Sequence, residues 1–166
     1  MAYQDIFQSM GEVKEYAKTL KQQNPTNMDD DIIDYVLGLY QGGDAVSVEG
    51  IGLIDTSIAP IIQSLNQKGF ITLSSCSGIK SEHTHSKYSF APVLVFKDTG
   101  DTDKKKHIQS VAKALQLTLH DDVECYLQKG YRIQFPSDMD DTKLLSLWKE
   151  LYAKLISEPD TNGISK

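Results

Sequence analysis

The chain has 166 residues, of which 40% are hydrophobic and 24% are charged, so we expect one globular domain and exclude a disordered or fibrous chain. No apolar stretch reaches the roughly 20 residues that cross a bilayer, and residues 1–5 lack the features of a signal peptide, so we expect a cytoplasmic protein without a membrane partner. The formal net charge is −6, with sixteen lysines and one arginine, which argues against a large nucleic acid as the partner because such ligands need a basic surface.

The first third of the chain predicts two amphipathic helices and a short strand. Apolar residues recur at three- and four-residue spacing over residues 4–23, and Asn24-Pro25 ends that helix. A second helix is expected over residues 29–40, because the aspartates at its start suit the positive end of a helix dipole. Alternating valines indicate a strand over residues 45–50.

A third helix, over residues 57–68, is expected to lead into the next strand. Pro60 falls in its first turn, where proline is tolerated, and Gly69 follows as the residue that ends it. The buried stripe of this helix is expected to consist of Ile58, Ile61, Ile62 and Leu65. The strand over residues 70–73 comes next, and a loop is expected directly after it.

The second half of the chain predicts three strands and two helices. The expected strands cover residues 92–96, 123–127 and 131–135. Residues 128–130 contain a glycine and are expected to form a hairpin turn between the last two strands. The expected helices cover residues 105–117 and 142–156. The whole pattern predicts a single compact α/β domain over residues 1–157, with a central mixed sheet flanked by helices, and a flexible tail over residues 158–166.

The most distinctive segment is Ser74-Ser75-Cys76-Ser77-Gly78, which we expect to form a loop at the end of a strand. Small hydroxyl residues and a glycine let a ligand approach the backbone closely and offer it N–H and O–H groups. This chemistry suits a phosphate, a carboxylate or the edge of a nucleobase. An ordinary polar turn is the alternative that spacing alone leaves open.

A family resemblance rests on the residues around this motif. They are Ile54-Asp55, Ile58-Ala59-Pro60-Ile61-Ile62, Leu65-Asn66 and Gly69-Phe70-Ile71-Thr72-Leu73, followed by Ser74-Ser75-Cys76-Ser77-Gly78. The pattern resembles the TYW-three family of wybutosine-synthesis methyltransferases, and also small bacterial and phage proteins with a similar motif. Membership would imply an α/β protein that binds S-adenosylmethionine and methylates a modified tRNA guanosine. The family's motif usually continues with arginine, where this chain has Ile79-Lys80, so the fold carries over better than the activity.

Side chains near the motif offer three kinds of chemistry. His83 and His85 form an H-x-H pair that, with Cys76, could supply metal ligands, but we expect no metal because the segment is polar and loop-like. The resemblance implies instead that one of these histidines contacts a ligand. Cys76 beside a histidine also fits a nucleophile, or simply a small packing residue. Arg132 is expected on the face of its strand opposite to Ile133, and that face is either a pocket or solvent-exposed.

We therefore expect a protein that binds a nucleotide-like small molecule around the motif, as a phage protein that sequesters a nucleotide immune signal would. The alternative is an S-adenosylmethionine-dependent methyltransferase that acts on a modified tRNA nucleoside, and a protein-interaction module is the third class. S-adenosylmethionine is the one cofactor implied, under the methyltransferase alternative, and the formation of a homo-oligomer is left open. The expected ligand-binding residues are Thr72, Ser74, Ser75, Cys76, Ser77, Gly78, Lys80, His83, His85 and Arg132.

Overall fold

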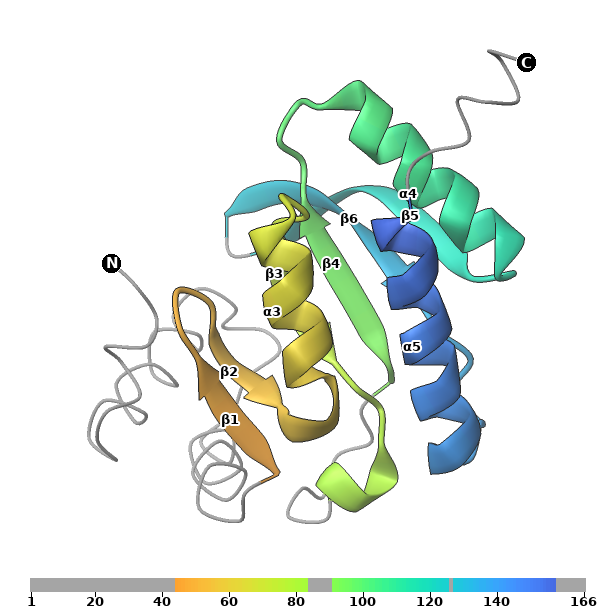
Figure 1. Cartoon of the computed structure of the whole chain (residues 1–166). Coiled ribbons are helices and arrows are strands. Elements are labelled where there is room, and N and C mark those ends of the chain that lie inside the picture. Colours follow the sequence, from red (N-terminus) through yellow and green to blue (C-terminus); the bar gives the residue numbers. More distant parts are fainter. Residues whose placement is uncertain (1–43, 84–90, 126, 158–166) are drawn as a thin grey trace.

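The computed structural model describes residues 44–83, 91–125 and 127–157, and in these ranges it contains two antiparallel sheets and three α-helices (Figure 1). The protein is therefore an α/β protein, as expected. The helices predicted over residues 4–23 and 29–40 lie outside the described residues, as do His85 and the predicted tail over residues 158–166.

The first sheet is a hairpin of β1 (Ala45–Val48) and β2 (Gly52–Asp55). The strand expected over residues 45–50 is confirmed as β1. Its partner β2 was not predicted, because four residues that begin with glycine carry little strand signal. A short 3-10 helix, η2 (Thr56–Ile58), connects β2 to the next helix.

Helix α3 (Ala59–Gln67) lies within the range predicted for it, residues 57–68, and starts two residues later because η2 precedes it. Pro60 lies in its first turn. At its other end Gly69 has a φ of 88°, its N–H donates to the carbonyl of Asn66, and the N–H of Phe70 donates to the carbonyl of Leu65. This pair of bonds satisfies carbonyls that a helix end leaves open, and the left-handed backbone explains why glycine stands there.

The second sheet has four strands in the spatial order β3-β4-β6-β5, and every neighbouring pair is antiparallel. Its strands are β3 (Thr72–Cys76), β4 (Val93–Lys97), β5 (Thr118–Cys125) and β6 (Gln128–Gln134). The prediction of a mixed sheet is therefore wrong. Because β6 lies between β4 and β5, the two strands joined through a helix are not neighbours, and no parallel pair forms in the described sheets.

The hairpin between β5 and β6 turns earlier than predicted, before residue 128. Gly130 lies inside β6, where it pairs with Lys97 of β4. A Cβ atom at this position would overlap the carbonyl oxygen of Phe96. The glycine that was interpreted as a turn signal is thus required by the close approach of two strands.

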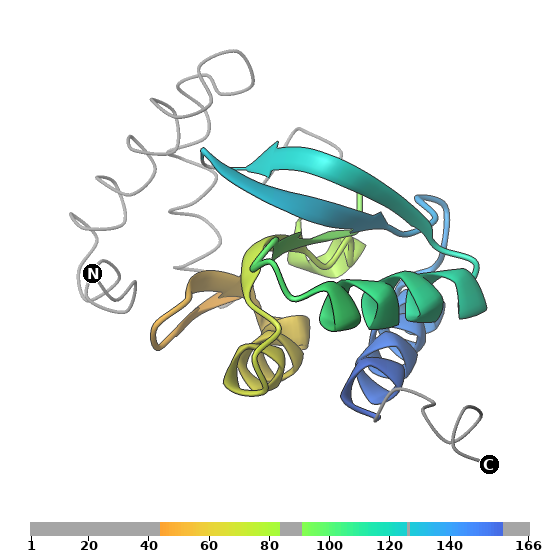
Figure 2. The same cartoon turned by 90° about the horizontal axis from the view of Figure 1, so that it is seen from above.

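The three described helices lie on one face of the four-stranded sheet (Figure 2). Helix α4 (Thr102–Ala114) begins three residues before the predicted start, because the Asp101 carboxylate accepts a hydrogen bond from Lys104 N and caps it. Helix α5 (Asp141–Ile156) matches the prediction closely. Between helices and sheet lies a core that includes Ile62, Leu65, Leu94, Phe96, Ile108, Ile133, Leu144 and Trp148. No helix among the described residues is long and apolar enough to cross a membrane.

Candidate functional site

The first three residues of the Ser74–Gly78 motif belong to strand β3 and not to a loop. Ser75 pairs with Leu94, whose side chain lies in the core, and Ser74 and Cys76 alternate with it. Ser74 and Cys76 therefore point away from the helices, while Ser75 points toward them. The expected loop is wrong at these three positions, because pairing with β4 outweighs the weak strand preference of serine.

Ser77 forms a fully buried corner at the end of β3. Its N–H donates to Asp55 Oδ2 over 2.7 Å, and its carbonyl accepts a hydrogen bond of 2.9 Å from Trp148 Nε1. Its hydroxyl donates to Glu82 Oε1 over 2.8 Å and accepts from the N–H of Ile79. Ser77 thus uses its polar groups to join β2, α5 and the short 3-10 helix η3 (Lys80–Glu82), and its amide is engaged inside the protein.

Glu82 is the second buried centre of this corner. It lies at the end of η3 (Lys80–Glu82) and is only 8% exposed. Its carboxylate accepts bonds from the N–H of Ser57 at 2.7 Å, the hydroxyl of Ser57 at 2.6 Å and the hydroxyl of Ser77. These bonds tie the segment before α3 to the segment after β3. Three donors to one carboxylate compensate its desolvation.

Replacing Glu82 by glutamine is expected to lower the free energy of unfolding by about 2–3 kcal/mol. Both carboxylate oxygens accept hydrogen bonds from Ser57 or Ser77, and the NH2 group of glutamine cannot accept. Urea denaturation followed by circular dichroism measures this effect. Glu150→Gln, on the exposed side of α5, is the matched control and should change stability by less than about 0.5 kcal/mol. Equal effects of the two variants would contradict the structural role of Glu82.

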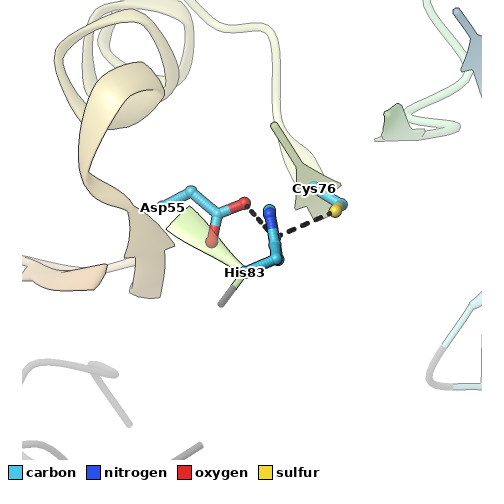
Figure 3. A group of neighbouring side chains, drawn as sticks. All are labelled: Asp55, Cys76 and His83. Carbon is cyan, nitrogen blue, oxygen red and sulfur yellow. Dashed lines mark hydrogen bonds and ion pairs between the residues drawn. The ribbon is translucent and has the colours of Figure 1, made fainter. Parts of the chain in front are cut away.

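Asp55, Cys76 and His83 come together next to this corner (Figure 3). Asp55 ends β2, Cys76 ends β3 and His83 follows η3. His83 Nε2 lies 3.4 Å from Asp55 Oδ2 and 3.5 Å from Cys76 Sγ. The other ring nitrogen, Nδ1, lies 2.7 Å from the carbonyl oxygen of Ile79. Since a carbonyl only accepts, Nδ1 carries a hydrogen atom and Nε2 is the nitrogen directed at both Asp55 and Cys76.

The surroundings of His83 favour its protonated form. Burial by itself lowers the pKa of this imidazole, but the hydrogen bonds to Asp55 and Cys76 and the electrostatic attraction of these groups outweigh burial and raise the pKa to about 11. Near neutral pH, a proton on Nε2 therefore lies between the carboxylate and the sulfur. The group is a concentrated, nearly buried set of one nitrogen, one oxygen and one sulfur donor atom.

Two other residues expected at the site, Thr72 and Lys80, form hydrogen bonds to helices. Thr72 is bound to α3, since its N–H donates to Asn66 Oδ1 and its hydroxyl accepts from Asn66 Nδ2. The backbone N–H of Lys80 donates to the Asp141 carboxylate and so holds the start of α5. Thr72 and Lys80 therefore hold helices in place through these bonds. The Lys80 carbonyl also accepts a hydrogen bond of 3.1 Å from the backbone N–H of His83.

Arg132 occupies the middle of β6, with Val95 opposite it on β4 and His120 opposite it on β5. Ser74 pairs with Val95 from the other side, so the four residues form one row across the sheet. Ile133 is fully buried in the core, and strand alternation therefore places Arg132 on the opposite face, as predicted. The row contains two of the expected site residues, Ser74 and Arg132.

Sequence reasoning did not find Asp55 as a site residue. It appeared within the family resemblance, but the only local signal was an acidic residue at the end of an unpredicted strand. Its partners Cys76 and His83 were both expected at the site. Comparison of the chain with protein-family models, curated proteins and solved structures gives no match.

Proposed function

We propose that the protein binds a small, negatively charged, nucleotide-like molecule on the face of the four-stranded sheet that points away from α3, α4 and α5. The observation that carries this proposal is the state of Arg132. Its Nε atom is buried and has no hydrogen-bond partner among the described residues. A buried donor without an acceptor is costly, so this position favours a ligand that supplies one.

The neighbours of Arg132 support an anionic ligand with further polar groups. Arginine presents a planar set of donors that matches a phosphate or carboxylate group. The Ser74 hydroxyl and the His120 imidazole lie in the same cross-strand row, and each can donate or accept a hydrogen bond. A phosphate at Arg132 with a sugar or base extending along the row would use all three groups.

We propose binding without turnover, so that the ligand leaves the protein unchanged. The buried acids next to the motif, Asp55 and Glu82, already accept hydrogen bonds from Ser77. These bonds stabilise the corner. We propose that the sequestered ligand lies on the sheet, centred on Arg132.

Arg132→Gln is expected to weaken ligand binding by about 10- to 100-fold, the range that follows from losing a charge-assisted hydrogen bond. Calorimetric titration with single nucleotides, cyclic nucleotides and ADP-ribose measures it. Lys129→Gln removes the same charge from an exposed position on the same strand, and it should leave affinity unchanged. Failure of all these probes to bind the wild-type protein, or equal losses in both variants, would contradict the proposal.

A second measurement separates binding from catalysis. After incubation, the protein is denatured and the small molecules are identified by mass spectrometry. Recovery of the intact nucleotide supports sequestration. Incubation with S-adenosylmethionine and bulk tRNA forms the other arm, and the appearance of S-adenosylhomocysteine with a methylated nucleoside would favour the methyltransferase.

A further inference from the structure

We propose that Asp55, Cys76 and His83 bind a zinc ion through Asp55 Oδ2, Cys76 Sγ and His83 Nε2, the three ligands that the described residues bring together. This proposal does not rest on nucleotide binding at Arg132. It departs from the sequence-based expectation of no metal, because the third ligand comes from β2, which the sequence did not place beside the motif.

Both distances from the histidine nitrogen to the other two donor atoms fit a tetrahedral ion. All three lie within 4.8 Å of one another. His83 Nε2 is 3.4 Å from Asp55 Oδ2 and 3.5 Å from Cys76 Sγ. Tetrahedral zinc with ordinary bond lengths separates nitrogen from oxygen by about 3.3 Å and nitrogen from sulfur by about 3.6 Å. These two spacings therefore accommodate zinc with movements of a few tenths of an ångström.

Two backbone contacts hold the ligands in orientations that suit a metal. The Nδ1–H of His83 donates to the Ile79 carbonyl, which fixes the ring and leaves Nε2 as the coordinating nitrogen. The Ser77 N–H donates to Asp55 Oδ2 over 2.7 Å and fixes that carboxylate. Contacts of this kind orient metal ligands and tune their affinity. The side chains of His83 and Asp55 are only 8% and 9% exposed, so packing further restricts them.

The way the three groups converge favours a metal over a catalytic triad. In a nucleophile–histidine–carboxylate triad, the nucleophile and the carboxylate bind opposite nitrogens of the imidazole ring. Here Asp55 and Cys76 both face Nε2, while Nδ1 is held by a backbone carbonyl. The three donor atoms therefore surround one point, at which an ion would replace the Nε2 proton and the thiol proton.

The donor set selects zinc among common ions. A thiolate and an imidazole favour zinc over magnesium and calcium, which prefer oxygen ligands. A closed structural site would need a fourth protein ligand, whereas three protein ligands with one open position are typical of catalytic zinc sites. The described residues supply three ligands, so with these alone the fourth position would hold water or an anionic group of a ligand.

The test uses the full chain, purified without a histidine tag, stripped with a chelator and titrated with zinc chloride by calorimetry. We expect one zinc ion per chain. Cobalt(II) added to the stripped protein should produce the absorption of a cobalt–thiolate bond. This spectrum tests the role of sulfur in the wild-type protein, without any substitution that could disturb folding.

Three variants test the ligands. Changes to contacts around a metal ligand cost about 10- to 100-fold in affinity, so Asp55→Asn, Cys76→Ser and His83→Gln should each weaken zinc binding by about 100-fold or more. Cys125→Ser is the matched control, because Cys125 is also a free, half-buried cysteine. Circular dichroism checks that each variant is folded.

The outcomes separate this site from the nucleotide proposal. Arg132→Gln should bind zinc as the wild-type protein does, whatever its effect on nucleotides. Absence of stoichiometric zinc binding, absence of the cobalt–thiolate absorption, or wild-type zinc affinity in folded Cys76→Ser would overturn the metal site. Loss of affinity in Cys125→Ser equal to that in Cys76→Ser would do the same.

Discussion

Replacing Gly78 by alanine should lower the free energy of unfolding by about 2–5 kcal/mol. Gly78 has a φ of 70°, a conformation that costs a residue with a side chain about 1–2 kcal/mol. A Cβ atom there would also lie only 2.6 Å from Cβ of Pro92, with two further ring atoms of Pro92 within 2.8 Å. A proline ring cannot swing aside as a flexible side chain can, so overpacking adds about 1–3 kcal/mol.

Gly100→Ala separates the two causes. Gly100 has a φ of 83°, but no atom lies within 4 Å of the position that its Cβ would occupy. This variant should therefore show only the backbone term, about 1–2 kcal/mol. Urea denaturation of both variants measures the difference. Equal destabilisation of the two variants would mean that Pro92 moves aside at little cost. Contact with Pro92 would then not be the reason that residue 78 is a glycine.

Trp148→Ala should have an even larger effect, a loss of about 4–8 kcal/mol from the free energy of unfolding. The Trp148 side chain is fully buried, and its ring stacks on Phe135 with centroids 4.4 Å apart. Removing a buried tryptophan costs about 3–5 kcal/mol. The Ser77 carbonyl would also lose the N–H that binds it, which adds about 1–3 kcal/mol for an unsatisfied buried group.

Trp148→Phe distinguishes packing from the hydrogen bond, because phenylalanine keeps an aromatic ring but has no donor. We expect this variant to lose about 1–3 kcal/mol, mostly from the unsatisfied Ser77 carbonyl. Thermal and urea denaturation give the values. A Trp148→Phe protein as stable as the wild type would show that the bond to Ser77 contributes nothing measurable.

Elements with local signals were predictable from the sequence. Helix α3 has a proline in its first turn and Gly69 just after its end. Helix α5 has an apolar stripe, and Asp140 caps its start. In each case the residues that start or end the helix lie within one turn of its end, so they can be recognised from the local sequence. The same holds for β4, whose apolar run marks an inner strand.

Features that depend on distant segments were not predictable in this way. The four-stranded sheet is antiparallel because β6 lies between β4 and β5, and no local sequence pattern encodes this strand order. The sequence around Gly130 predicts a turn, because the close approach of the Phe96 carbonyl oxygen, which requires the glycine, is not visible in the local sequence. At the candidate site, Cys76 and His83 are near in sequence and were both expected. Asp55 joins them only because β2 lies beside the end of β3.

The hydrogen bonds of Ser77 also bear on the order in which the protein folds. Its partners Asp55 and Trp148 are 22 and 71 residues away along the chain. Closing such long loops costs entropy before any contact compensates it, so these bonds form after local helices and the β5–β6 hairpin. The corner that orients the Asp55 carboxylate is thus assembled late in folding. Because α5 is bound to Ser77 through Trp148, we expect the Ser77 amide to exchange slowly in comparison with other described residues.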